Sequence, residues 1–126
     1  MTARLIIQLA GLLGALSVGI GAFGAHGLRA MLTVTNRSET FETAVRYQFY
    51  HVLALLAIGI LYQVRPELRG LGTVAWLWLG GMLIFSGSLY VLCLTGITKL
   101  GAITPIGGLL LIAGWVMVFV VAMRQL

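Results

Sequence analysis

The sequence predicts an all-α polytopic membrane protein, an antiparallel bundle of four transmembrane helices that forms one integral membrane domain over residues 1–126. Hydrophobic residues make up 60% of the chain and charged residues only 9%, whereas an ordinary soluble domain has about 25% charged residues. The apolar residues gather into four stretches, each close to the roughly 20 residues that a helix needs to cross a bilayer. These stretches lack the alternation of barrel strands, so each span should be helical.

The first span is expected at residues 5–25, where small residues recur at helical spacing. Small residues four apart let two helices approach closely in lipid, which predicts a place in the middle of the bundle. The stripe expected to pack contains Gly11, Ala15, Gly19 and Ala22, and Gly24 is expected to pack as well. A second stripe of small residues lies beside it, at Ala10, Gly14, Ser17 and Gly21.

A secretory signal is the alternative interpretation of this first stretch, because Arg4 precedes the apolar run and Ala22-Phe23-Gly24 resembles a cleavage site. The apolar region of a signal is usually about 7–15 residues long, and this run is longer. We therefore favour an uncleaved span.

One long helix is expected over residues 37–64, because this stretch contains a single glycine and no proline. Its first part, residues 37–46, should be an amphipathic helical start, and residues 47–64 should cross the membrane. Glu42 and Arg46 are four residues apart and can form an ion pair on its surface.

The segment at residues 27–36 mixes apolar and basic residues, which is typical of a short helix lying in the membrane interface. Asn36 followed by Glu39 resembles a capping box, so Asn36 is expected to be the N-cap of the long helix.

The third span is expected at residues 71–94 and the fourth at residues 103–123. Pro66 and Gly70 occupy the short link before the third span, so the second and third helices should be antiparallel neighbours. Thr104 is a plausible N-cap for the fourth helix, because a proline follows it.

Residues near the span ends bear on the placement in the bilayer. Trp76 and Trp78 near the start of the third span, and Tyr90 near its end, fit the aromatic belts of a membrane interface. Lysine and arginine number four at each end: Arg4, Arg65, Arg69 and Arg124 against Arg29, Arg37, Arg46 and Lys99. The count is a tie, and an N-terminal amine favours both termini being cytoplasmic.

Nearly all the unusual polar residues fall at one end of the spans. If the spans alternate in direction, their side chains reach one membrane face, and this polar cluster is the candidate binding site. Its members are His26, Glu42, Arg46, Tyr47, Gln48, His51, Ser86, Ser88, Tyr90, Lys99 and Thr104. Gly87 and Gly107 nearby are expected to pack between helices.

Both histidines of the chain, His26 and His51, belong to this cluster. With Glu42 they could ligate a divalent metal or relay protons. The spacing contains no HExxH or CxxC motif, so we favour structural hydrogen bonds and expect no metal or cofactor. Ser86 with a histidine base is a further alternative, but a nucleophilic serine elbow needs a strand-to-helix turn, which a helix interior does not offer.

The glycines around His26 allow two interpretations. Gly21, Gly24 and Gly27 are spaced by three, and glycine-rich backbone can form a nest for an anion. The same spacing is also that of one tightly packed helical face. We favour packing and keep the anion nest as the alternative.

Four sequence blocks together resemble a known family of small membrane proteins called domain of unknown function 423, which includes transmembrane protein 256. The blocks are Gly21-Ala22-Phe23-Gly24-Ala25-His26-Gly27-Leu28, Thr43-Ala44-Val45-Arg46-Tyr47-Gln48 with His51, Phe85-Ser86-Gly87-Ser88-Leu89-Tyr90 and Ile103-Thr104-Pro105-Ile106-Gly107-Gly108. The resemblance covers almost the whole chain and implies a four-helix protein of the bacterial inner membrane. It implies no activity, and it argues against cleavage after Gly24, which would split the first block.

Three functional hypotheses follow. We favour a non-enzymatic membrane protein that binds lipid, a partner membrane protein or a second copy of itself through the polar cluster. The second hypothesis is an oligomeric transport element for a small solute, ion or proton, and the third is an enzyme acting on a lipid or quinone headgroup. Nucleic acid is not expected as a partner, because the basic residues are scattered singly.

Overall fold

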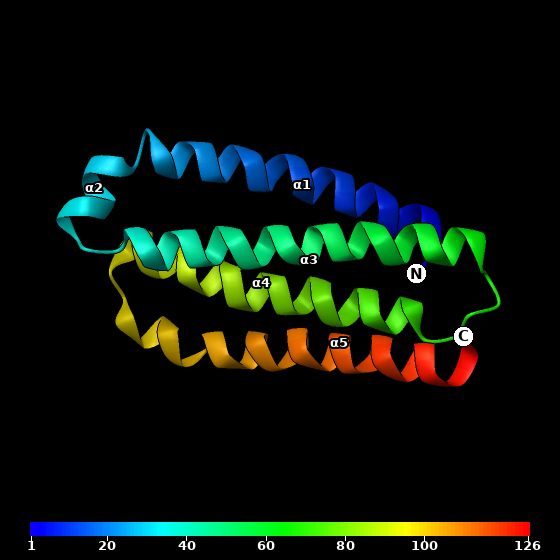
Figure 1. The fold of residues 1–126 in the computed structure, drawn as a ribbon. Helices are drawn as coiled ribbons and strands as arrows, with labels where there is room; N and C mark the ends of the chain where they lie inside the picture. Colours follow the sequence, from blue (N-terminus) through cyan, green and yellow to red (C-terminus); the bar gives the residue numbers. More distant parts are fainter.

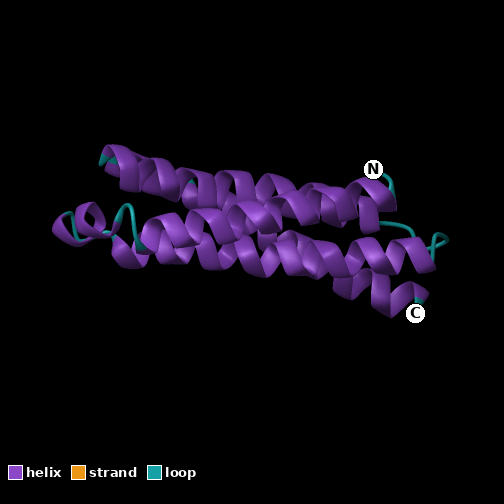
Figure 2. Ribbon diagram, turned by 90° about the horizontal axis from the view of Figure 1, so that it is seen from above, coloured by secondary structure: helices purple, strands orange, loops and turns teal.

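The computed structural model describes residues 1–126 and is helical throughout apart from short links. Its elements are α1 (Ala3–Ala25), α2 (Arg29–Val34), α3 (Ser38–Val64), α4 (Leu71–Thr95), the 3₁₀ helix η1 (Thr98–Ala102) and α5 (Thr104–Gln125). The four long helices run antiparallel, with α2 and η1 at one end and both termini at the other (Figures 1 and 2). All four are long and apolar enough to cross a membrane. The predicted fold class is confirmed.

The two middle helices of the bundle are α3 and α4. Helix α1 packs mainly on α3, and α5 packs mainly on α4 (Figure 1). Only 17% of the apolar window of α1 is buried, against 39% in α3. The outer face of α1 exposes apolar side chains such as Leu12 and Val18. The expectation that α1 lies in the middle of the bundle is therefore wrong: α1 is an edge helix whose apolar outer face is uncovered.

The rotation of α1 also differs from the expected one. A Cβ added at Gly11 or Gly19 would meet no atom within 4 Å, and Ala15 is exposed. The neighbouring stripe faces α3 instead, where Ser17 is 1% exposed. Both stripes have helical spacing. The second stripe faces α3 because it contains Ser17, whose hydroxyl accepts a hydrogen bond from the Gln48 amide of α3 at 2.9 Å.

Of the other three glycines expected at helix contacts, two lie there and one does not. A Cβ added at Gly24 would overlap the Phe41 ring, and one added at Gly107 would overlap the backbone of Phe85. Gly107 thus brings α5 against the backbone of α4. A Cβ at Gly87 would meet nothing within 4 Å, so the packing role expected for Gly87 is wrong within this chain.

The apolar core lies between all four long helices and extends towards the end that carries the termini. Trp78 is 1% exposed within it. Its indole Nε1 donates to the Leu111 carbonyl at 3.2 Å, in a space that Gly114 leaves open. Trp78 is therefore a core residue and not part of an interfacial belt. Trp76, 64% exposed, keeps an outward orientation.

The link between α2 and α3 corrects the expected helix start. Asn36 has a φ of 56°, and the N–H of Arg37 donates to the Leu32 carbonyl at 2.9 Å. This is a Schellman ending of α2 with Asn36 in the left-handed conformation that asparagine tolerates. Asn36 therefore ends α2 and does not cap α3, whose N-cap Arg37 makes no side-chain capping bond.

At the other end of the bundle, the link between α3 and α4 also holds the C-terminus. Gly70 adopts a φ of 102°, which favours glycine at the start of α4. The Gln125 amide bonds both the backbone N–H and the carbonyl of Arg69, each at 2.8 Å. Arg65 donates to Glu67 and holds the pKa of that carboxyl below its usual range.

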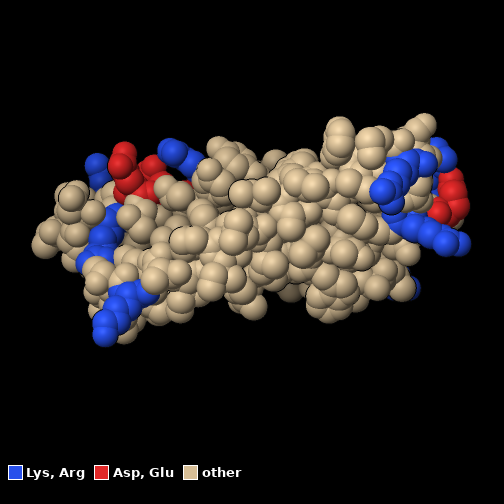
Figure 3. Space-filling view, turned by 90° about the horizontal axis from the view of Figure 1, so that it is seen from below, with Lys and Arg blue, Asp and Glu red and all other residues tan.

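Charged side chains occur only near the two ends of the molecule. Figure 3 shows lysines, arginines and acidic residues at both ends of one face and none across the broad middle. This is the charge distribution of a bundle whose middle lies in hydrocarbon and whose ends lie among headgroups.

Candidate functional site

The structure divides the predicted polar cluster into several groups at different depths. His26 follows the end of α1 and shares a cavity wall with Glu42. His51 lies nine residues further along α3, a rise of about 13 Å. The expected single cluster at one level is therefore wrong. An alternating topology brings the side chains to the same half of the bundle, but the length of α3 spreads them along the membrane normal.

The first buried group ties three helices together. The Tyr90 hydroxyl of α4 donates to Gln48 Oε1 at 2.6 Å. Gln48 Nε2 then donates to Ser17 Oγ of α1 at 2.9 Å, and the Ser17 hydroxyl donates to the Leu13 carbonyl at 2.7 Å. Each of these three side chains makes a hydrogen bond to another helix, so the group connects the helices.

Two serines of α4 form the second group. Ser86 Oγ donates to the Ala44 carbonyl of α3 at 2.6 Å. Ser88 Oγ lies 2.6 Å from Thr104 Oγ1 at the start of α5. Both serines are buried, and both engage a neighbouring helix. Ser86 has no histidine beside it as a base, which removes the geometric support for a nucleophile.

His51 forms the third group, together with aromatic rings. Its Nδ1 lies 2.7 Å from the Tyr47 carbonyl and must donate there, because a carbonyl only accepts. Its Nε2 accepts from Trp115 Nε1 at 3.0 Å. Both ring nitrogens are occupied, so binding a metal at His51 would require breaking one of these bonds. Trp115 is the partner that the sequence did not suggest.

The hydrogen bonding of the buried groups is complete. No buried side-chain nitrogen or oxygen lacks a partner in the chain. No group of three histidine, cysteine or acidic side chains is close enough to hold a metal ion. The weak metal candidates His26, His51 and Glu42 are thus divided, with His51 apart from the other two. These observations favour the structural interpretation of the deep polar residues.

The end of the bundle near α2 contains a cavity of about 640 Å³ between α1, α2 and α3, which we call the interfacial cavity. Its polar lining includes two arginines and one glutamate, with a histidine and two hydroxyl groups. The lining residues are Gly21, Gly24, Ala25, His26, Arg29, Leu32, Thr33, Ser38, Phe41, Glu42, Val45 and Arg46. Three members of the predicted cluster therefore meet here: His26, Glu42 and Arg46.

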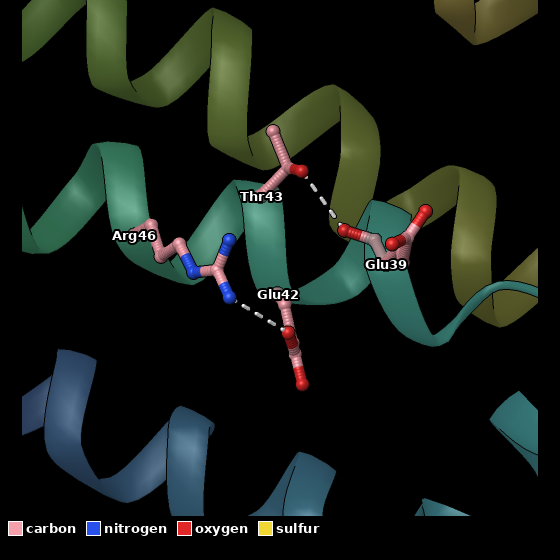
Figure 4. A network of polar contacts seen from close by, with 4 residues as sticks. All are labelled: Glu39, Glu42, Thr43 and Arg46. Atoms are coloured by element: carbon pink, nitrogen blue, oxygen red, sulfur yellow. Dashed lines mark hydrogen bonds and ion pairs between the residues drawn. The ribbon is translucent and has the colours of Figure 1, made fainter.

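The charges of the cavity are only partly neutralised. Arg46 Nη2 lies 3.1 Å from Glu42 Oε2, with both side chains more than 60% exposed. Figure 4 shows this pair on α3, with Glu42 extending to the side on which α1 lies. In the same view, the Thr43 hydroxyl donates a hydrogen bond to the Glu39 carbonyl at 2.9 Å. Arg29 forms no ion pair, so the cavity carries an excess of positive charge.

The walls of the cavity combine polar and apolar surface. Leu32 and Phe41 are buried side chains at its inner side, and Val45 continues the apolar wall along α3. Gly21 and Gly24 form the α1 side, where the absence of side chains lets Val45 and Phe41 of α3 come close to the α1 backbone. Gly24 receives the Phe41 ring, which supports packing over an anion nest for these glycines.

Several predicted residues lie outside the cavity, and some lining residues were not predicted. Lys99 is exposed on η1 and does not line it. Tyr47 is exposed and faces the aromatic group around His51, 4.9 Å from the Phe85 ring. Arg29 and Ser38 were missed. A basic residue in the interfacial segment next to His26 was the available signal for Arg29.

A second cavity of about 630 Å³ lies at the opposite end, around the link between α3 and α4. Arg69, Thr73 and Trp76 contribute to its lining. Glu67 also lines it but is engaged by Arg65. It shares no residue with the predicted cluster, so the interfacial cavity remains the candidate site.

Comparison with known proteins agrees with the fold. A family profile described as "Protein of unknown function (DUF423)" matches residues 20–108. The UPF0382 membrane protein SH2409 of Staphylococcus haemolyticus is 49% identical over 117 residues, 93% of each chain. The UPF0382 membrane protein YwdK of Bacillus subtilis is 39% identical over 98% of this chain and 99% of its own. No solved structure matches.

Proposed function

Since the chain belongs to the DUF423 family of bacterial multi-pass membrane proteins, a family described without an activity, we propose that it is a non-enzymatic protein that binds a membrane amphiphile. The binding site is the interfacial cavity between α1, α2 and α3. One observation carries the proposal: charged side chains and apolar side chains line the same cavity at the end of the membrane-spanning bundle.

An amphiphile fits both parts of this cavity. Arg29, Arg46 and Glu42 provide polar partners for a headgroup, and Phe41 and Val45 provide apolar contacts for the carbon atoms next to it. Ligand sites are typically about 300–1,000 Å³ with mixed linings, and a cavity of about 640 Å³ lies within that range. Only part of a lipid would be enclosed, and the rest would lie in the bilayer.

We test the proposal with a phospholipid that carries a photoreactive diazirine in its acyl chain. Crosslinked peptides should come mainly from residues 21–24 of α1 and 41–45 of α3. The variant Gly21→Phe places a ring in the cavity, because a Cβ there already lies 3.3 Å from Val45. It should lower crosslinking at these positions at least several-fold.

The matched control is Gly19→Phe on the same helix, where an added Cβ meets nothing within 4 Å. It should leave the crosslinks unchanged. Circular dichroism and size-exclusion chromatography check that both variants keep their helical content and size. Crosslinks spread evenly over the outer faces of α1 and α5 would indicate lipid contact without a site and would overturn the proposal.

The proposal includes an orientation with both termini cytoplasmic and the interfacial cavity on the opposite face. Lysines and arginines number four at each end, so charge counting alone does not choose. A C-terminal reporter that fluoresces only in the cytoplasm should be active. A reporter active only outside the cytoplasm, fused at the same place, should be silent.

The transport hypothesis has less support than binding. The half of the bundle near the termini is filled by apolar side chains such as Ile58, Val74 and Met82. A water-filled path would have to pass through this core. Proteoliposomes should therefore show no flux that depends on His51, and solute flux abolished by His51→Ala would favour transport.

A further inference from the structure

We infer that the interfacial cavity selects amphiphiles whose headgroup carries a phosphate. The inference rests on the proposed function and specifies its ligand. Its basis is the charge and the hydrogen-bonding state of the groups around the cavity, which leave cationic donors without a partner in the chain.

The cations of the cavity outnumber its acids. Arg29 and Arg46 face a single carboxylate, that of Glu42. Arg29 forms no ion pair, and Arg46 binds Glu42 through one nitrogen only, Nη2. A guanidinium has five N–H donors arranged in a plane, and this arrangement matches two oxygens of a phosphate. Most of the donors of both arginines remain available.

The start of α3 adds further donors on the same side. Ser38 lines the cavity and its hydroxyl makes no hydrogen bond in the chain. The backbone N–H groups of Ser38, Glu39 and Thr40 also lack acceptors, because the helix has no side-chain cap. The N-terminus of a long helix carries a partial positive charge. It strengthens the positive potential that the arginines create.

The apolar part of the cavity favours a lipid phosphate over free phosphate. The side chains of Leu32, Phe41 and Val45, which line the cavity, offer no hydrogen bond to an inorganic ion, whereas the glycerol and acyl carbons of a lipid can pack against them. A phospholipid therefore uses both parts of the lining, whereas inorganic phosphate uses only one.

The experiment compares two lipids with identical acyl chains in nanodiscs. Dioleoyl-phosphatidylglycerol carries a phosphate, and dioleoyl-diglucosylglycerol is a neutral lipid without one. Native mass spectrometry of the released protein counts how many of each remain bound. We expect retention of the phospholipid to exceed that of the neutral lipid by at least fivefold. Inorganic phosphate at millimolar concentration should displace neither.

Three charge variants should change the preference for the phospholipid in different ways. Arg29→Gln should lower the preference about fivefold, which corresponds to about 1 kcal/mol for one cation near a headgroup. Glu42→Gln should raise the preference, because it removes the competing carboxylate and frees Arg46. Lys99→Gln removes a charge at the same membrane face but outside the cavity, and should leave the preference unchanged.

The outcomes separate this inference from the proposed function. If both dioleoyl lipids are retained equally while the photoreactive phospholipid crosslinks to the cavity, a lipid site exists but does not select phosphate, and the inference fails alone. If the photoreactive phospholipid does not crosslink to the cavity, the proposed function fails. Displacement by inorganic phosphate would identify a free-phosphate site and overturn the lipid ligand. An equal effect of Lys99→Gln and Arg29→Gln would show general surface attraction and overturn the inference.

Discussion

Single polar side chains hold the deep part of this bundle together. Gln48 illustrates the reason: an amide buried among apolar helices must use its oxygen and its nitrogen, and here they bond two different neighbours. A polar residue in the middle of a membrane helix therefore specifies which helix faces it. This explains why the buried polar residues of this chain are connectors, while the partly unpaired charges lie at the interface.

The Gln48 connection predicts a measurable coupling. Gln48→Leu should lower the free energy of unfolding by about 1–2 kcal/mol, since it breaks two cross-helix bonds that average about 0.6 kcal/mol each and reach about 1.7. Tyr90→Phe should cost less, because it breaks one. In the double variant the second change should cost nothing more, since the Tyr90 hydroxyl has already lost its acceptor. Reversible unfolding in mixed micelles measures all three, and additive costs would contradict the connection.

His51 predicts a spectroscopic result. Its contacts require the neutral Nδ1–H tautomer, with Nε2 accepting from Trp115. Nitrogen-15 NMR of histidine-labelled protein should show this tautomer. Trp115→Phe should shift the Nε2 resonance and leave Nδ1 nearly unchanged. His26→Gln removes the only other histidine and assigns the signals. Observation of the Nε2–H tautomer in the unmodified protein would refute this hydrogen-bond arrangement.

Whole helices pack through missing side chains as well as through polar bonds. The α4–α5 contact depends on Gly107, which lies against the backbone of Phe85. Backbone cannot rotate aside as a side chain can, so this contact leaves no room for a methyl group. Gly114 also leaves no room for a methyl group, because the buried Trp78 indole fills the space beside it.

This packing predicts a strong difference between two conservative substitutions. Gly107→Ala should destabilise the protein by about 1–3 kcal/mol, because the added methyl group forces α5 away from α4. Gly87→Ala on α4 is the matched control, since a Cβ there meets nothing within 4 Å, and it should change stability by less than about 0.5 kcal/mol. Thermal unfolding in detergent compares them. Equal effects would contradict the close α4–α5 contact.

The sequence was sufficient for the helices and insufficient for their faces. Length and composition determine where four spans lie, because hydrocarbon thickness fixes how many apolar residues a helix needs. The rotation of α1 was not determined, since two stripes of small residues have the same period. The depth of His51 relative to His26 was also missed: the sequence shows which half of a span a residue occupies, but side chains spaced along one helix do not form one site.

At the scale of the whole molecule, the alternating passage of four helices predicts which links share a side. Leu126 and the α3–α4 link at Pro66 should lie on one face, and the exposed Thr35 and Thr98 on the other. Single cysteines at these positions test this in a Cys93→Ala background, because Cys93 is the only native cysteine and is buried.

An impermeant maleimide applied to intact cells should label one pair and spare the other. With both termini cytoplasmic, cysteines at positions 35 and 98 react from outside, and those at 66 and 126 react only after lysis. The reversed pattern would keep the four-span bundle and reverse the orientation, which would place the interfacial cavity in the cytoplasmic leaflet. Labelling of 66 together with 98 would contradict the antiparallel passage of α4, since both ends of one crossing cannot be on the same side.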